Sequence, residues 1–349
     1  MDASSQETFS VRLEPSGRVL SVAAGSTVLD AAVRGGVSIP HTCRSGICKT
    51  CKGTLVSGRL HGPTAQDEDT SAGAGAEGAP GDAMLLCRSV PRSDCVLQVP
   101  GATELKFQPE TYPARVAGID KPAADVAVLR LRLPMNRKLN FLAGQYLDVL
   151  LGDGARRSYS IASAPQPGGI VDVELHVRHY PGGQFSDRLF ADKPLAGMLL
   201  VEAPLGGFFL QEEGPGPVIL LATGTGFAPI QAMVEDAIRS GRSARQDFHV
   251  YWGARSVTDL YRVERALRWA SEAPGLRFTP VLSREPPQDW SGRRGYVQHA
   301  VMEDFADLAQ AEVYACGSEA MVESAQRELV QARGLPEDRF FADAFYASR

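Results

Sequence analysis

The chain has 349 residues, enough for about two or three domains, and its 44% hydrophobic and 22% charged residues are ordinary for a globular protein. A net charge of −5 excludes a generally basic nucleic-acid-binding protein. No apolar run approaches the ~18–20 residues that span a bilayer, and the polar N-terminal segment does not resemble a secretory signal. We therefore expect a cytoplasmic protein without a membrane partner.

The N-terminal part of the chain has the pattern of a small mixed domain. Alternating apolar residues predict two strands within 9–22. A short helix follows, which Ser26 would cap and the glycine pair at 35–36 would end. The Gly- and Ala-rich stretch 71–83 predicts a flexible surface excursion, and residues 95–99 predict a closing strand.

The rest of the chain shows two further patterns. Residues 113–212 contain short strands interrupted by Gly and Pro, which favours an antiparallel barrel. From about 214 onward, apolar strands alternate with helices, beginning with the continuous apolar run at 218–222, which is typical of a buried parallel strand. This last pattern predicts a doubly wound α/β domain.

Four of the six cysteines form a spaced group, and in a reducing compartment such a group indicates metal or redox chemistry. Their pattern, Cys-x4-Cys-x2-Cys followed by a distant fourth cysteine, is the plant-type [2Fe–2S] spacing. A structural zinc site is the alternative, but zinc loops usually use paired Cys-x2-Cys units. The predicted cluster ligands are Cys43, Cys48, Cys51 and Cys87.

With these motifs, residues 9–99 resemble a chloroplast-type ferredoxin domain, and the remainder resembles the ferredoxin–NADP reductase superfamily. The order ferredoxin–FAD–NAD is similar to the reductase components of multicomponent oxygenases and equally similar to CDP-6-deoxy-glucoseen reductase. The implied fold class is multidomain α+β and α/β. It comprises a [2Fe–2S] ferredoxin (β-grasp) domain at 1–102, a linker at 103–112, an antiparallel β-barrel FAD domain at 113–212 and a doubly wound α/β nicotinamide-binding domain at 213–349.

The sequence Arg157, Ser158, Tyr159, Ser160 matches the family's Arg-x-Tyr-Ser flavin motif. The guanidinium of Arg157 offers a planar set of donors to a pyrophosphate. By resemblance, Tyr159 would lie against the flavin and its ribityl chain. The hydroxyl of Ser160 would donate to N5 of the isoalloxazine, which makes it a candidate catalytic residue.

A second segment for the same cofactor follows the strand that carries Val177. Gly182 and Gly183 allow backbone amides to approach a phosphate, and Ser186 would begin a helix directed at it. The order of the two segments, roughly 20 residues apart in strand-rich surroundings, predicts FAD.

A glycine-containing loop joins the first buried strand of the C-terminal domain to a helix. Gly224, Thr225 and Gly226 would bring the backbone close to a dinucleotide pyrophosphate, which would face the helix N-terminus. Pro229 fits the first helical turn, where no N–H donor is needed. The loop therefore predicts a nicotinamide cofactor.

Two later strand ends would set the choice of nicotinamide. Arg255 ends a Trp-Gly-Ala-Arg stretch that resembles NADH-using oxygenase reductases. Ser283 and Arg284 form a pair that in the superfamily can hold a 2′-phosphate, which would favour NADPH. We favour NADH, with NADPH as the alternative.

The last strands carry the remaining candidates. By resemblance, Cys316, with Gly317 and Met321 of its Cys-Gly-x-x-x-Met pattern, would lie beside the nicotinamide C4 and the flavin N5. A buried core thiol is the alternative for Cys316, as we expect for Cys95. Near the C-terminus, Asp343 and Phe345 would approach the flavin, and Phe345 would shield its ring, unless this segment is a plain hydrophobic clamp.

Nicotinamide gives two electrons together and an iron–sulfur cluster accepts one, so flavin is needed to convert between them. We predict an NAD(P)H-dependent oxidoreductase, with nothing to require more than a monomer, that passes electrons through FAD and a [2Fe–2S] cluster to an acceptor protein. The resemblance implies the terminal component of an oxygenase, one that hydroxylates aromatic rings. The alternative is a CDP-6-deoxy-delta-3,4-glucoseen reductase serving a deoxysugar dehydratase. A non-catalytic iron–sulfur or zinc module is a third reading, which the flavin and nicotinamide motifs disfavour.

Overall fold

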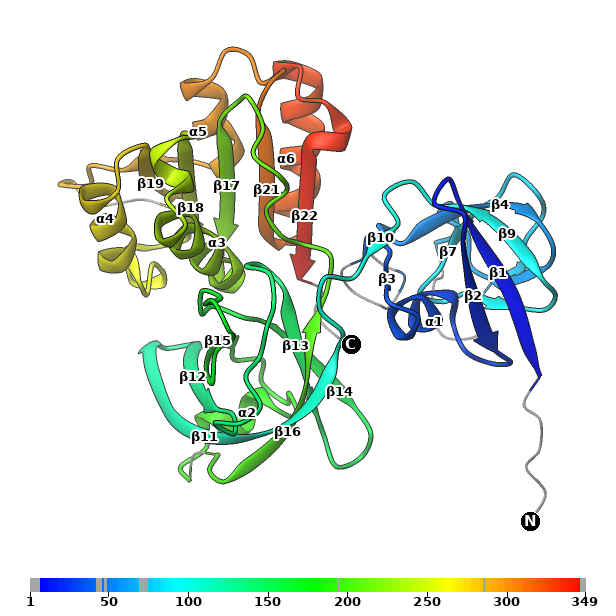
Figure 1. The fold of residues 1–349 in the computed structure, drawn as a ribbon. Helices are drawn as coiled ribbons and strands as arrows, with labels where there is room; N and C mark the ends of the chain where they lie inside the picture. Colours follow the sequence, from blue (N-terminus) through cyan, green and yellow to red (C-terminus); the bar gives the residue numbers. More distant parts are fainter. Residues whose placement is uncertain are drawn as a thin grey trace. The chain divides into compact units, whose positions relative to one another are not determined.

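The computed structural model divides the chain into two compact units (Figure 1). The first comprises Met1–Pro109 with Gly206–Phe208, and the second comprises Glu110–Leu205 with Phe209–Arg349. The structure describes residues 7–41, 46, 49–68, 75–193, 195–284 and 287–345.

The first unit is built on a mixed five-stranded sheet in the order β2-β1-β9-β4-β7, with short sheets β10-β3 and β6-β5-β8 beside it. The β1–β2 hairpin is antiparallel, and β9 joins β1 in parallel, as expected for a closing strand. Its elements are β1 (Thr8–Glu14), β2 (Arg18–Ala23), α1 (Val28–Arg34), β3 (Val37–Ser38), β4 (Lys52–Ser57), β5 (Leu60–Gly62), β6 (Ala76–Glu77), β7 (Ala83–Leu85), β8 (Val90–Pro91), β9 (Cys95–Gln98) and β10 (Thr103–Glu104).

Two local expectations for this unit need correction. Helix α1 is capped by Thr27 and not by Ser26, because the extended backbone of Thr27 lets its hydroxyl accept the Asp30 amide at 3.1 Å. Residues 75–83, the described part of the stretch 71–83, also contain regular structure that was not expected. Ala76–Glu77 forms β6, which pairs with β5, and backbone hydrogen bonds to β5 outweigh the weak strand preference of Gly and Ala.

The second unit begins with a six-stranded antiparallel sheet in the order β14-β13-β16-β11-β12-β15. A bridge between Ile161 and Leu175 brings the two edge strands together, which gives the predicted barrel. Along β12, Leu129 and Leu131 are buried while Arg130 and Arg132 are exposed, so the alternation in the sequence specifies the inner face. The elements are β11 (Glu110–Ala123), β12 (Val126–Arg132), β13 (Tyr146–Leu150), β14 (Arg156–Ser160), β15 (Asp172–Arg178), α2 (Ser186–Phe190) and β16 (Met198–Leu205).

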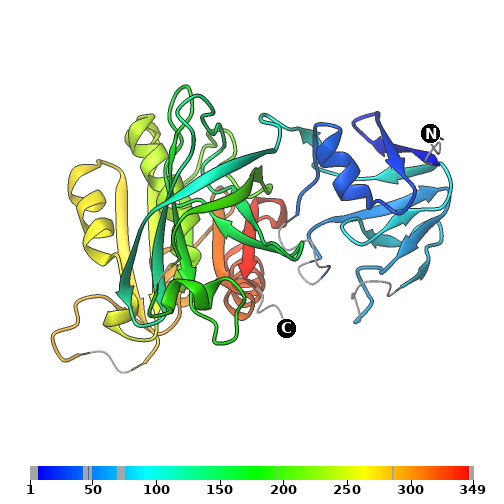
Figure 2. The same cartoon turned by 90° about the horizontal axis from the view of Figure 1, so that it is seen from below.

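The rest of this unit is a parallel sheet in the order β20-β19-β18-β17-β21-β22, with α3 and α4 on one face and α5 and α6 on the other (Figure 2). Such an order is doubly wound. Successive strands are added toward one edge of the sheet from β17 to β20 and toward the other edge from β21 onward, so the order switches between β17 and β21. The elements are β17 (Val218–Thr223), η1 (Gly224–Gly226), α3 (Phe227–Arg239), η2 (Arg242–Ala244), β18 (Phe248–Ala254), η3 (Val257–Asp259), α4 (Val263–Glu272), β19 (Leu276–Leu282), β20 (Arg293–Arg294), α5 (Val297–Asp304), β21 (Glu312–Ser318), α6 (Glu319–Arg333), η4 (Glu337–Arg339) and β22 (Phe340–Phe345).

The predicted domain boundaries stay predictions. The segment 103–112, expected to be a linker, contains β10, which pairs with β3, and the first residues of β11. Among the described residues, no helix combines the length and apolar character that a membrane crossing requires.

Candidate functional site

A cavity of about 540 Å³ opens at the carboxyl ends of the parallel strands, the edge at which doubly wound sheets bind ligands. Barrel residues Val126, Arg178 and Tyr180 form part of its wall. Several predicted nicotinamide-site residues line it, namely Gly224, Thr225, Arg255, Ser283 and Met321, and so does Phe345, which the sequence assigns to the flavin.

The loop Gly224–Gly226 follows β17 as a single 3₁₀ turn that leads into α3, as the sequence predicts. Gly224 has a φ of +54°, in the left-handed region that favours glycine. A Cβ on Gly226 would lie 2.2 Å from the carbonyl oxygen of Cys316. Only glycine therefore allows this loop to pack directly on the end of β21. Gly224 and Thr225, on the other side of the loop, line the cavity.

The aromatic side chains behind the loop hold it in place. The indole Nε1 of Trp252 donates to the Gly224 carbonyl at 3.2 Å, and its ring stacks on Phe227, with ring centroids 3.8 Å apart. Both rings are fully buried. A dinucleotide would thus meet a preorganised backbone and not a flexible turn.

Cys316 is fully buried in β21, in register with Ala222 of β17 and Asp343 of β22. Burial, with the nearby Asp343 carboxylate, raises the pKa of the Cys316 thiol well above its ordinary value. A thiol in this state is protonated at neutral pH, so it suits a role in positioning and not one as a nucleophile.

Residues next to Cys316 complete this side of the cavity. Gly317 has a φ of +147°, and a Cβ there would lie 2.1 Å from Oγ1 of Thr223, so the end of β21 packs tightly against β17. Phe345 ends β22 in register with Ser318 and faces the cavity. Asp343 is buried and does not line the cavity. The contacts of Asp343 and Phe345 with a flavin stay predictions.

The residues predicted to choose the nicotinamide lie at the exposed edge of the cavity. The Ser283 hydroxyl donates to the Ala254 carbonyl at 3.2 Å, so it is directed toward its own chain. Arg255 is exposed and lines the cavity. Arg284 is exposed but lies outside the cavity lining.

The flavin motif lies on β14, which pairs with β13. Arg157 extends to Oε1 of Gln184, which accepts a hydrogen bond from Nη2 at 2.6 Å. The ring of Tyr159 packs on Phe185 with centroids 5.4 Å apart, and burial raises the pKa of the Tyr159 hydroxyl. Ser160 is buried at the end of the strand. A planar donor, a sheltered aromatic ring and a buried hydroxyl fit a flavin with its pyrophosphate.

The glycine segment after β15 forms as predicted, with Ser186 as the first residue of α2. The Gly182 amide donates to Asp187 at 2.9 Å and the Gly183 amide to the Tyr180 carbonyl at 2.8 Å. Val177 is fully buried in the barrel core. The phosphate-binding role of these residues stays a prediction, and it requires at least the Gly182 amide to exchange its partner.

In the first unit, two of the four predicted cluster ligands are described. Cys51 and Cys87 are both buried in the core, and the Leu86 amide donates to the Cys51 carbonyl at 2.9 Å, which joins their two segments. Two cysteines buried in one apolar core, on segments joined by a hydrogen bond, fit a thiolate-bound metal cluster. Cys43 and Cys48 lie outside the described residues.

One polar cluster was not predicted. Glu174 and His176 alternate with buried residues along β15 and look like ordinary outward-facing residues in the sequence, yet both are covered by the α/β part of the unit. The signal in the sequence that could have indicated this cluster is a glutamate and a histidine two positions apart, on the same face of one strand. The sequence gives no indication of which residues cover them.

A mixed-sheet unit with buried thiols, a barrel with a flavin motif and a doubly wound sheet with a dinucleotide loop define an electron-transfer flavoprotein reductase. Three family models match the chain in the same order. They are the 2Fe-2S iron-sulfur cluster binding domain at residues 11–92, the oxidoreductase FAD-binding domain at 113–210 and the oxidoreductase NAD-binding domain at 220–327. The chain belongs to the family of ferredoxin–FAD–NAD(P)H reductases that includes dehydrase reductases and oxygenase reductase components.

Its relatives match it over nearly the whole length. The CDP-6-deoxy-L-threo-D-glycero-4-hexulose-3-dehydrase reductase of Yersinia pseudotuberculosis is 39% identical over 346 residues, which cover 98% of this chain and 100% of that protein. The terephthalate 1,2-dioxygenase reductase component 2 of Comamonas sp. is 32% identical, covering 96% of each. The crystal structure of an Amycolatopsis cytochrome P450 reductase superposes with a TM-score of 0.80 at 32% identity, covering 97% of this chain and 99% of that one.

These matches confirm the predicted fold class and the three cofactors. The protein is an NAD(P)H-dependent oxidoreductase that carries electrons by way of FAD and a [2Fe–2S] cluster.

Proposed function

We propose that this chain is the reductase component that supplies electrons to a 3-dehydrase acting on a CDP-linked 6-deoxy-4-hexulose. The observation that carries the proposal is its greater identity, over the full length of both chains, with the Yersinia dehydrase reductase than with the dioxygenase reductases. The sequence favoured an oxygenase acceptor and kept the deoxysugar enzyme as its alternative. Full-length similarity instead favours the deoxysugar dehydrase as the acceptor, with an oxygenase as the alternative.

The residues of this chain prepare the donor end of the reaction. The loop Gly224–Gly226 would bind the dinucleotide through its backbone, and Cys316 would fill the space beneath the nicotinamide. Ser160 would hold a hydrogen bond at the flavin, and Arg157 would bind its pyrophosphate. Flavin, when bound, supplies the exchange between a two-electron donor and one-electron carriers.

For the donor itself, we propose NADH in preference to NADPH. The Ser283 hydroxyl is directed toward the Ala254 carbonyl, and Arg284 lies outside the cavity lining. Neither observation favours a built site for a 2′-phosphate. Both observations agree with the stretch that ends at Arg255, whose resemblance to NADH-using reductases favours NADH.

An oxygenase acceptor is the second candidate. It is favoured by the close superposition on the Amycolatopsis cytochrome P450 reductase and by the family of dioxygenase reductases that match the whole chain. The two candidates share every donor-side residue, so only the acceptor distinguishes them.

The test uses the loaded protein with each acceptor in turn. Under anaerobic conditions, NADH oxidation should depend on both the Yersinia dehydrase and its CDP-sugar substrate. The comparison is oxygen-dependent NADH oxidation with the terminal component of terephthalate dioxygenase and terephthalate. Turnover only with the dioxygenase would overturn the dehydrase proposal and favour the second candidate.

Two cysteine variants separate a failed acceptor from a failed reductase. Cys87→Ser should lose iron–sulfur absorbance and electron delivery to any protein acceptor, while NADH still reduces the flavin. Cys95→Ser is the matched control, because Cys95 is equally buried and its thiol lies within hydrogen-bonding distance of the Arg59 and Ser93 carbonyls. It should keep the cluster.

A further inference from the structure

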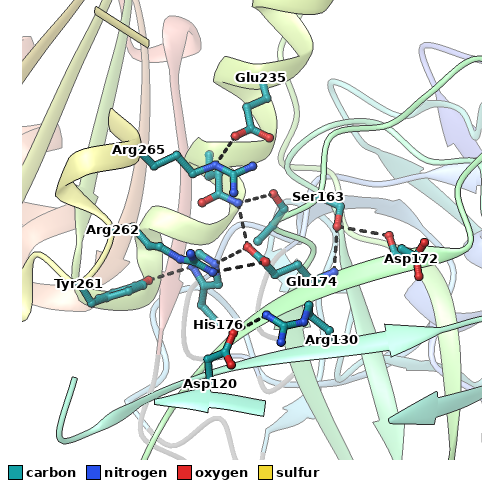
Figure 3. Close-up of polar contacts among 12 residues, drawn as sticks. Asp120, Arg130, Ser163, Asp172, Glu174, His176, Glu235, Tyr261, Arg262 and Arg265 are labelled. Carbon is teal, nitrogen blue, oxygen red and sulfur yellow. Dashed lines mark hydrogen bonds and ion pairs between the residues drawn. The ribbon is translucent and has the colours of Figure 1, made fainter. Parts of the chain in front are cut away.

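A buried hydrogen-bond network joins the flavin barrel to the α/β part of the second unit (Figure 3). Its centre is Glu174 of β15, which is mostly buried. We call it the Glu174 network, and its members are Glu174, His176, Gln231, Tyr261 and Arg262.

Three donors converge on the Glu174 carboxylate. Gln231 and His176 lie 3.1 Å from Oε1, and Arg262 Nη2 lies 3.4 Å from Oε2. Burial alone would raise the pKa of Glu174, but hydrogen bonds from His176 and Gln231 and the Arg262 charge outweigh it and lower the pKa to about 2. The carboxylate is therefore ionised and accepts from residues of both parts of the unit.

His176 passes the connection on to Tyr261. Burial lowers the pKa of the His176 imidazole, against the opposing effect of Glu174, so the ring is neutral. Because Nε2 faces a carboxylate, Nε2 carries the proton and donates. The other nitrogen, Nδ1, then accepts from the Tyr261 hydroxyl at 2.9 Å.

Tyr261 in turn contacts the aromatic side chains that hold the nicotinamide loop. Its ring meets Trp252 edge to face, with centroids 5.2 Å apart and planes at 90°. Trp252 donates to the Gly224 carbonyl at 3.2 Å. A continuous line of contacts therefore runs from barrel strand β15 to the loop Gly224–Gly226.

A second connection reaches the other end of the loop. Gln231 lies in α3, which begins directly after the loop. Its side-chain amide donates to the Ala162 carbonyl at 3.0 Å as well as to Glu174. The loop is thus connected to the barrel through Trp252 on one side and through α3 on the other.

We propose that the Glu174 network sets the position of the nicotinamide loop relative to the flavin barrel, and that Tyr261 is a positioning residue for electron transfer from nicotinamide to flavin. None of the five residues is placed at a cofactor by the sequence motifs. Their effect passes through Trp252 and α3 to the backbone that faces the dinucleotide. A displacement of about 1 Å between reacting groups is enough to slow a reaction about a hundredfold.

The test compares two single hydroxyl deletions in the loaded protein. Tyr261→Phe keeps the ring but leaves Nδ1 of His176 without its donor. Tyr251→Phe is the matched control, because Tyr251 is also buried and donates to a carboxylate, Asp304, at 2.8 Å. It lies next to Trp252 on β18 and points to the opposite face of the sheet.

Three measurements are made on each variant. Hydrogen exchange is followed in peptides covering residues 220–230, flavin reduction by NADH is followed by stopped flow, and unfolding is followed by thermal melting. For Tyr261→Phe we expect about tenfold faster exchange in the loop and about tenfold slower limiting flavin reduction, with the NADH concentration for half-maximal rate changed less than about twofold. Both variants should lower the melting temperature by a similar amount. Tyr251→Phe should leave the loop exchange and the limiting rate of flavin reduction unchanged.

Equal changes in loop exchange and in flavin reduction in both variants would overturn the proposal, because the network would then be only a source of stability. Unchanged loop exchange in Tyr261→Phe would overturn it as well. His176→Gln provides a second variant, since the amide can both donate to Glu174 and accept from Tyr261. It should recover more of the limiting rate than His176→Leu, which can do neither.

Discussion

The nicotinamide cavity has two regions that differ in how they are built. The floor consists of the loop Gly224–Gly226, part of which lines the cavity, with Cys316 and Gly317 packed behind it. Its contacts are made by backbone atoms at distances that no side chain could share. The rim consists of Arg255 and Ser283, which line the cavity, with Arg284, which is next in the chain to Ser283 and lies outside the lining. All three residues are exposed. A floor of this kind can fix where the nicotinamide lies, whereas an exposed rim can only favour one nucleotide over another.

The difference predicts two kinds of variant. Floor substitutions should change stability and the chemical step together, because the same backbone contacts serve both. Rim substitutions should change the binding of the nucleotide without changing stability, since exposed side chains contribute little to folding.

Gly226→Ala should have the largest effect. The added Cβ would lie 2.2 Å from the Cys316 carbonyl, so the loop must move away from β21. We expect a loss of about 2–3 kcal/mol in the free energy of unfolding and no measurable flavin reduction by NADH. Denaturant unfolding and stopped flow check the two parts.

Gly152→Ala is the control for that substitution. Gly152 is exposed, and a Cβ there would meet nothing within 4 Å. Its unfolding and flavin reduction should match those of the unchanged protein. If Gly226→Ala unfolds at the same denaturant concentration as Gly152→Ala, the floor is not fixed by this contact.

Cys316→Ala should have the next largest effect, and it tests whether the floor acts on the reaction. We expect the limiting rate of flavin reduction to fall about tenfold to a hundredfold, because the buried thiol supports the end of β21, on which the loop Gly224–Gly226 packs. FAD content should not change. Cys95→Ala removes an equally buried thiol in the first unit, so an equal loss of rate there would show that Cys316 has no positioning role.

The strand, glycine loop and helix that form the floor could be predicted from the sequence, and the reason is physical. Gly224, Gly226 and Gly317 occupy positions that demand either a left-handed backbone or the absence of a side chain. Such demands restrict a position to one residue type, so a motif can report them. The parallel sheet was predictable for a similar reason, because β17 is buried on both faces and reads as a continuous apolar run.

The Glu174 network could not be predicted in this way. Glu174 and His176 alternate correctly with the barrel core, and the alternation describes them as solvent-facing. They are buried only because α3 and the segment before α4 fold over them, a packing of parts about 60 to 90 residues apart. The cap of α1 was missed on a smaller scale, since serine and threonine both cap helices and backbone geometry decides between Ser26 and Thr27.

Glu174→Gln tests whether the carboxylate charge of the Glu174 network stabilises the protein, and its effect should vary with pH. The pKa of Glu174 falls from an ordinary 4.5 to about 2 in the folded chain, so its contribution is fully present above pH 4.5 and is lost as the pH falls toward 2. At pH 7 the variant should be about 2 kcal/mol less stable, and the difference should shrink below pH 4.5.

Melting curves at several pH values check this expectation. Glu212→Gln, a change at an exposed carboxylate, should show no difference from the unchanged protein at any pH. A Glu174→Gln difference that stays constant down to pH 3 would mean that the carboxylate charge is not what the network stabilises.

The smallest effects belong to the rim. Arg284→Ala should lower kcat/KM for NADPH by about threefold to tenfold and leave the value for NADH almost unchanged, because the 2′-phosphate is an additional charged group of NADPH that an exposed guanidinium can attract. Arg255→Ala should lower both values alike, since its side chain lines the cavity. Arg268→Ala, an exposed arginine outside the cavity lining, controls for net charge. The melting temperatures of all three variants should stay within about 1 °C of that of the unchanged protein. A rim variant that lowers both the stability and the limiting rate of flavin reduction would contradict the distinction between rim and floor.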